Sequence, residues 1–338
     1  MRDYLLGLRS TYATLLGYSS SNGSNRLTVI QPAAPPTAWV EPRPFYFTAV
    51  AAAATLILAV ALAYVAAIRD DRVREGEEVE QVTGLPILAA IPSGTRGRSR
   101  APHIHPPGTP IASAIDGLRI GIEAFVQEQG GGMSIVVLSP SGDQGASDTA
   151  ANLAISLAGS TGNVLLVDAD LIRPQQHLVF EVEGRVGLTT LLRRDDPTHV
   201  DDAIQRTRIP GLRILPAGPT LSEVGWTGSG VFRRILPALR ANGDVIVFDT
   251  PPLDTNTIGL ALAAEATATI LIARLGVTTR SSLQEARNRL ELVGAQVLGV
   301  AVVGLKAIPP GAPDAVGRPR FPTIDPLATP QRTPPHAG

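Results

Sequence analysis

One apolar run in this chain of 338 residues is far longer than the others. Phe45 to Ile68 contains 24 residues without a charged side chain. A helix rises about 1.5 Å per residue, so a helix of this length spans the roughly 30 Å hydrocarbon core of a bilayer. The pattern predicts a transmembrane helix at residues 45–68, with a buried core helix as the less favoured alternative.

Beyond residue 132, short apolar runs alternate with amphipathic segments. The runs predict six buried strands, at Ser134–Leu138, Val164–Val167, Leu212–Leu215, Val245–Phe248, Thr269–Ala273 and Val297–Val303. The amphipathic segments predict four helices, near Ala146–Ala158, Val231–Ala241, Thr257–Ala264 and Ser281–Val293. This alternation predicts an α/β fold with a doubly wound, mostly parallel sheet.

These elements divide the chain into five parts. We expect an extracytoplasmic tail with a proline-rich collar at 1–44, the membrane helix at 45–68, a juxtamembrane segment and linker at 69–132, the α/β domain at 133–308 and a disordered proline-rich tail at 309–338. Within the juxtamembrane part, the charged residues 69–81 predict a helix and residues 84–92 predict a short strand.

Charge and composition narrow the function classes. The formal net charge is −1, so no global basic field indicates a nucleic-acid partner. Cysteine is absent, which excludes disulfides, a Cys-ligated zinc site and a Cys nucleophile. Three arginines, Arg69, Arg72 and Arg74, follow the membrane segment closely and slightly favour a cytoplasmic C-terminal side.

The first strand of the α/β domain leads into SPSGDQGASDT at 139–149, a glycine-bearing turn before a helix. Such a turn can hold phosphate, because its backbone N–H groups converge at the positive end of the helix. Of the pattern G-x-x-x-x-G-K-[ST], Gly145 and Ser147 are present, but Pro140 replaces the first glycine and Ala146 replaces the lysine. The chain's single lysine is Lys306.

Carboxylates follow two further strands. Asp168 and Asp170 follow the second strand and Asp249 ends the fourth, so all three are expected at the edge of the sheet that carries the loop. Magnesium-dependent phosphoryl transfer needs carboxylates there. Capping of loops by these aspartates is an equally favoured alternative, and for Ser147 a plain helix N-cap is slightly favoured. Arg173 could hold a phosphate, but pairing with a surface acid is the commoner fate of an arginine.

Four of these segments, VVLSPSGDQGASDTAANLAISLA, VLLVDADLIRP, DVIVFDTPP and LGVAVV, resemble the bacterial tyrosine kinases of capsular and exopolysaccharide systems. These kinases are a branch of the deviant P-loop ATPases. The membrane half, with TVIQPAAPP and GLPILAAIP, resembles the end of a polysaccharide chain-length determinant. The resemblance implies a P-loop NTPase-like domain behind a single-pass helix of the bacterial plasma membrane, with that domain in the cytoplasm. It also implies an earlier membrane helix and an extracytoplasmic domain that these residues lack; a reduced protein, a mis-assigned start and a split system all stay open.

The resemblance also implies site residues. Nucleotide binding would fall to Gly142, Gly145, Ala146, Ser147 and Asp148, the Mg²⁺ ion to Ser147 and Asp249, and catalysis to Asp168 and Asp170. Ala146 cannot supply the ammonium group that neutralises the phosphates, so we expect ATP and Mg²⁺ to bind weakly or not at all. Residues 65–338 contain no tyrosine, which excludes tyrosine autophosphorylation there. The family's oligomerisation motif survives only as Ser113, Asp116 and Arg119.

These features favour a catalytically inactive, membrane-anchored relative that acts as a regulator or scaffold in exopolysaccharide or capsule biosynthesis, export or chain-length control. Its expected partners are the plasma membrane, the polysaccharide polymerase or export machinery, and further copies or related subunits. An active ATP-dependent tyrosine kinase or ATPase that acts on another chain is the main alternative. A partition-like membrane ATPase is a weaker one.

Overall fold

The computed structural model describes Tyr12 and residues 44–92, 105, 108–129, 132–194, 199–220 and 229–305. The chain divides into two units, Met1–Ala67 and Ile68–Gly338, and each is considered by itself. The expected proline-rich tail at 309–338, nearly all of the expected tail at 1–44 and most of the linker at 93–107 lie outside the described residues.

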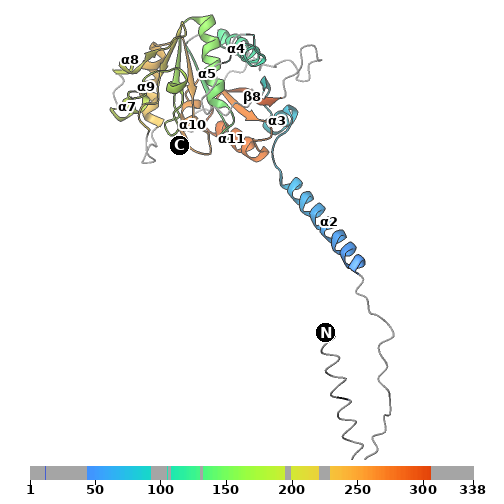
Figure 1. Cartoon of the computed structure of the whole chain (residues 1–338). Helices are drawn as coiled ribbons and strands as arrows, with labels where there is room; N and C mark the ends of the chain where they lie inside the picture. Colours follow the sequence, from blue (N-terminus) through green and yellow to red (C-terminus); the bar gives the residue numbers. More distant parts are fainter. Residues whose placement is uncertain are drawn as a thin grey trace, which may run out of the picture. The chain divides into compact units, whose positions relative to one another are not determined.

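The first unit contains helix α2 (Pro44–Arg69), which continues into the start of the second unit (Figure 1). Its stretch Phe45–Val65 is the one helix among the described residues that is long and apolar enough to cross a membrane, and none of it is buried. The hydroxyl of Thr55 donates to the carbonyl of Ala51 at 2.8 Å. A hydroxyl satisfied within its own helix suits an apolar surrounding, where water could not satisfy it.

The second unit is built on one sheet of eight strands. The strands are β1 (Ile87–Pro92), β2 (Met133–Leu138), β3 (Val164–Asp168), β4 (Gln205–Arg206), β5 (Leu212–Leu215), β6 (Val245–Asp249), β7 (Ala268–Arg274) and β8 (Val297–Leu305). Their order is β1-β8-β7-β2-β6-β3-β5-β4, and every pair is parallel except β4 with β5. The predicted doubly wound sheet and its six strands are confirmed.

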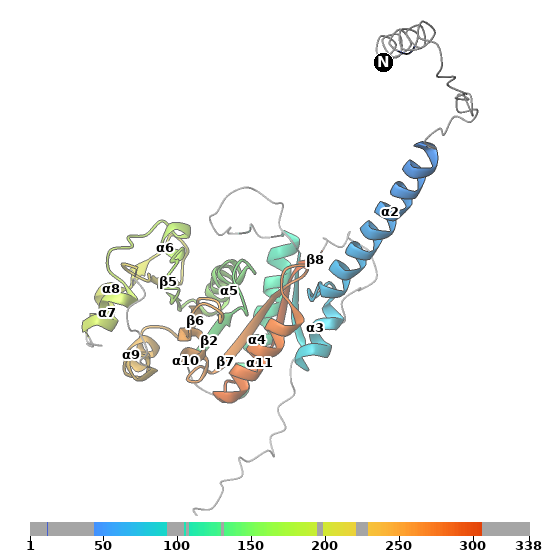
Figure 2. The same cartoon turned by 90° about the horizontal axis from the view of Figure 1, so that it is seen from below.

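Helices cover both faces of this sheet (Figures 1 and 2). They are α3 (Gly76–Thr83), α4 (Pro110–Gln129), α5 (Ala146–Thr161), α6 (Gln176–Val179), α7 (Leu188–Arg194), α8 (Val200–Ala203), α9 (Ser229–Ala241), α10 (Ile258–Ala263) and α11 (Arg280–Leu292). Side chains of β2 alternate between two apolar cores: Ile135 packs with α4 and α5, and Val136 packs with the core that includes α9, α10 and α11. Because both faces are covered, the central strands are apolar throughout.

The juxtamembrane segment differs from its prediction. The helix expected over residues 69–81 begins only at Gly76, because the preceding residues pair with the loop before α11 instead. Val73 is fully buried, its N–H donates to Thr278 O at 2.9 Å, and its carbonyl accepts from Gly276 N at 2.8 Å. Backbone groups committed to this pairing cannot also form helical hydrogen bonds.

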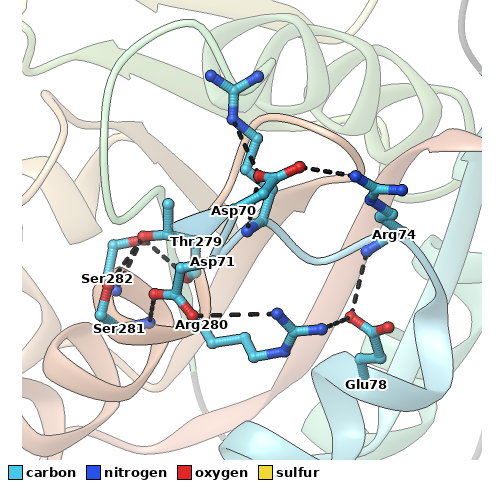
Figure 3. A network of polar contacts seen from close by, with 9 residues as sticks. Asp70, Asp71, Arg74, Glu78, Thr279, Arg280, Ser281 and Ser282 are labelled. Carbon is cyan, nitrogen blue, oxygen red and sulfur yellow. Dashed lines mark hydrogen bonds and ion pairs between the residues drawn. The ribbon is translucent and has the colours of Figure 1, made fainter. Parts of the chain in front are cut away.

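Polar contacts fix the same segment to the start of α11 (Figure 3). Asp71 Oδ2 accepts from the backbone N–H of Ser281 at 3.0 Å, in the first turn of the helix. The hydroxyl and amide of Ser281 lower the pKa of Asp71. Arg280 pairs with Glu78 of α3 at 2.8 Å. The residues that directly follow α2 are thereby part of the α/β unit.

Candidate functional site

The loop between β2 and α5 joins a parallel strand to a helix at the edge of the sheet where a phosphate loop is expected. Its backbone enters the left-handed region twice, at Asp143 with φ 59° and at Gly145 with φ 89°. Aspartate tolerates this conformation better than most residues other than glycine. Arg274, the last residue of β7, donates from Nη1 to the carbonyl of Asp143 at 2.9 Å. This contact holds the loop at its strained residue.

The loop amides are available to an anion. Among the described residues, no acceptor takes a hydrogen bond from the backbone N–H groups of 142–147. Helix α5 begins directly after this loop, and its N-cap, Gly145, carries no capping side chain. Free amides at a helix N-terminus form a positive cradle.

The cation that normally completes such a cradle is missing. Ala146 lies at the start of α5 with 8% of its surface exposed, so only a methyl group stands at the lysine position. Lys306, the single lysine, lies outside the described residues. Arg173 is one alternative cation beside the loop: a Cβ atom built on Gly142 would lie 3.4 Å from its Nη2. None of the ion pairs between described residues involves this guanidinium, and its pairing with a surface acid stays a prediction.

Two of the three predicted aspartates come together. Asp168 and Asp249 end the adjacent strands β3 and β6 and are register partners. Both are buried, with 0% and 1% of their surfaces exposed. Asp170 differs, because its Oδ1 accepts from the backbone N–H groups of Ile172 at 3.2 Å and Arg173 at 2.9 Å. Asp170 therefore caps the turn after β3, as the alternative interpretation expected.

Gln176, which the sequence analysis did not identify, joins the acidic pair to the loop. Its backbone N–H donates to Asp168 Oδ2 at 3.0 Å. Its side-chain Nε2 donates to Asp249 Oδ2 at 2.7 Å and to the carbonyl of Ser147 at 3.0 Å. One fully buried side chain thus connects β6 with α5, and its own backbone reaches β3.

Burial controls the charge of the pair. It raises the pKa of Asp249 to about 7, while hydrogen bonds from Gln176 and Ser147 act in the opposite direction, and the charges of Asp170 and Asp148 add to the rise. Burial and then the charge of Asp249 raise the pKa of Asp168 well above its ordinary value. Two carboxyl groups this close and this buried favour retaining a proton.

The predicted metal residues have a free ligand atom. Asp249 Oδ1 and Gln176 Oε1 are buried and have no hydrogen-bond partner within the described part of the chain. Orphaned acceptors of this kind are costly unless water or a cation meets them. No group of three or more His, Cys, Asp or Glu in the described residues could hold a metal ion. Mg²⁺ usually keeps several of its waters and needs only one or two protein carboxylates, so Asp249 and Ser147 fit a hydrated Mg²⁺ ion.

Two remnants of the oligomerisation motif, Asp116 and Arg119, make contacts within their own domain, while Ser113 is exposed. Asp116 Oδ1 in α4 accepts from the hydroxyl of Ser156 in α5 at 2.5 Å. Arg119 pairs with Glu123 at 2.7 Å within α4, and Glu123 also accepts from Ser160. These contacts join α4 to α5.

Comparison with known proteins shows which family the chain belongs to. No family model matches it. It is 30% identical over 174 residues to the tyrosine-protein kinase YwqD of Bacillus subtilis, covering 51% of this chain and 73% of that protein. The chain belongs to the bacterial capsule and exopolysaccharide tyrosine-kinase family. Among other members, it is 28% identical over 242 residues to the tyrosine-protein kinase ptk of Acinetobacter johnsonii, where the match covers 67% of this chain but spans only 32% of that relative's length.

A solved structure agrees with this membership. The chimeric protein CapA2B2 superposes with a TM-score of 0.59 and 27% identity, covering 69% of this chain and all of the chimera. The fold expected from the resemblance is therefore correct: a mostly parallel α/β domain of the P-loop type, together with one apolar helix nearer the N-terminus.

Proposed function

We propose that this chain is a membrane-anchored, non-catalytic member of the family that acts as a regulator or scaffold in exopolysaccharide or capsule biosynthesis, export or chain-length control. The observation that carries the proposal is Ala146, the methyl group at the start of α5 where a phosphate loop carries its lysine. Loss of one charge-assisted hydrogen bond of about 1.5 to 3 kcal/mol weakens nucleotide binding roughly tenfold to a hundredfold. Phosphoryl transfer suffers more, because its catalysis is mainly charge stabilisation.

The proposal that this chain is a non-catalytic family member also includes its membrane helix and its partners. The exposed apolar stretch Phe45–Val65 would cross the bacterial plasma membrane once, with residues 133–308 on the cytoplasmic side. The domain would contact the polymerase or export machinery, and it would assemble with its own copies or with related subunits. ATP and Mg²⁺ would bind weakly, at the loop and at Ser147 with Asp249.

An active kinase or ATPase that acts on another chain is the second candidate. The position of Arg173 against Gly142 favours it, because a guanidinium there could partly replace the lysine. Asp168 would then activate the acceptor hydroxyl. The two candidates differ in turnover, which makes turnover the decisive test.

The experiment measures phosphate release from ATP, and transfer to a tyrosine-containing polymer, by the detergent-solubilised full chain. Asp249→Asn serves as the blank for contaminating ATPases, since it removes the proposed metal ligand. We expect the wild-type rate to equal that blank. A wild-type rate clearly above the Asp249→Asn rate would refute the non-catalytic assignment and favour the second candidate.

A further inference from the structure

Gln176 occupies an unusual position for a glutamine. It is the first residue of the short helix α6, its surface is 0% exposed, and it follows Asp168 by eight residues. Burial of a carboxamide is costly unless its polar atoms are paired. Both hydrogens of Nε2 are used, one on Asp249 Oδ2 and one on the carbonyl of Ser147. A leucine or methionine would fill the same volume without leaving a buried oxygen unpaired, so the amide itself needs an explanation.

The two Nε2 contacts join the residues that would hold a divalent cation. The bond to Asp249 Oδ2 fixes the carboxylate and leaves Oδ1 without a partner, buried among the described residues. The bond to the Ser147 carbonyl fixes the first turn of α5, which carries the Ser147 side chain. Carboxylates that ligate metals are themselves held by hydrogen bonds from an outer shell, and losing such a partner typically weakens metal binding about tenfold to a hundredfold.

We propose that Gln176 is a positioning residue that orients Asp249 and Ser147 toward a divalent cation. The inference rests on the proposed function because both concern the site at Asp249 and Ser147. It requires only that this site binds a divalent cation, without ATP and without turnover. The lysine position and Gln176 are separate parts of the site, because Gln176 contacts Asp168, Asp249 and the Ser147 carbonyl rather than the free loop amides.

The test is a titration of the detergent-solubilised full chain with Mn²⁺, followed by electron paramagnetic resonance without nucleotide. Gln176→Met keeps the side-chain length and removes both donors. Gln175→Met is the matched control, since the neighbouring glutamine makes no capping hydrogen bond through its side chain. We expect Gln176→Met to weaken Mn²⁺ binding by at least tenfold and Gln175→Met to leave it unchanged.

A double-mutant comparison separates positioning from general damage. In an Asp249→Asn background, where the ligand is already lost, adding Gln176→Met should weaken Mn²⁺ binding no further. If Gln176→Met does not fold, Gln176→Asn takes its place, because the shorter amide cannot reach both acceptors. Equal Mn²⁺ affinity in the wild type and the folded Gln176 variant would overturn the proposal, as would wild-type binding no tighter than that of Asp249→Asn. Phosphate release by the wild type would contradict the non-catalytic assignment and leave this inference standing.

Discussion

Replacing Asp249 by asparagine tests the energetics of the buried pair. The carboxyl group of Asp249 is buried at the end of β6, and its pKa is raised from 3.8 to about 7. The folded chain therefore keeps a proton that the unfolded chain releases above about pH 4. The unfolded state then binds fewer protons, so the free energy of unfolding falls as the pH rises, and it levels off once Asp249 ionises in the folded state near pH 7.

The size of this effect follows from the shift. The rise from 3.8 to about 7 spans roughly three pH units. At about 1.4 kcal/mol per unit, the wild type loses on the order of 4 kcal/mol of stability between pH 4 and pH 7 through this group. Asp249→Asn has no titrating group at residue 249, so the variant does not lose this stability between pH 4 and pH 7. Removal of the Asp249 charge also lowers the pKa of Asp168, which adds to the difference in the same direction.

The assay is urea unfolding of the detergent-solubilised full chain at several pH values between 4 and 8, followed by circular dichroism. We expect the stability of Asp249→Asn relative to the wild type to increase steadily from pH 4 to pH 7 and then to flatten. Asp254→Asn, a change at an exposed aspartate five residues further on, should run parallel to the wild type. A stability difference for Asp249→Asn that does not change with pH would refute the reasoning from burial.

Two further predictions concern the loop between β2 and α5 and the close packing around Gly187, just before α7. Ala146→Lys restores a charge-assisted hydrogen bond, so isothermal titration calorimetry should find ATP bound about tenfold to a hundredfold more tightly than by the wild type; unchanged affinity would count against the role given to the missing lysine. At Gly187, an added Cβ would clash with the carbonyl oxygen of Pro216, so Gly187→Ala should lower the free energy of unfolding by about 1 to 3 kcal/mol. Gly159→Ala is its control, because a Cβ in α5 meets nothing within 4 Å and should stabilise by up to about 1 kcal/mol.

The strands could be predicted from the sequence because a doubly covered sheet requires continuous apolar runs, such as Ile135 to Leu138 in β2. Helix α4 was missed, although its signal is present. Ile115, Leu118 and Ile122 recur at helical spacing and are buried against α5 and the sheet. The proline-rich linker before it and the absence of charge in its first turn concealed its start.

The candidate site, like the fold, could be predicted from the sequence only in part. The loop and the strand-end aspartates could be placed from the sequence, because a βα turn and the ends of adjacent parallel strands meet at one edge of a sheet. Gln176 and Arg274 could not. Gln176 reaches Asp249 only because the turn capped by Asp170 folds the chain back, and Arg274 reaches Asp143 because β7 pairs with β2, a strand more than a hundred residues away in the sequence. No spacing in the sequence encodes either contact.

The most direct test of the central claim is the turnover of the wild-type chain itself. With Mg²⁺ and saturating ATP, the account predicts phosphate release and tyrosine phosphorylation no faster than those of the Asp249→Asn blank, because a methyl group stands at residue 146 where the phosphates need a cation. Sustained wild-type turnover above that blank would contradict it.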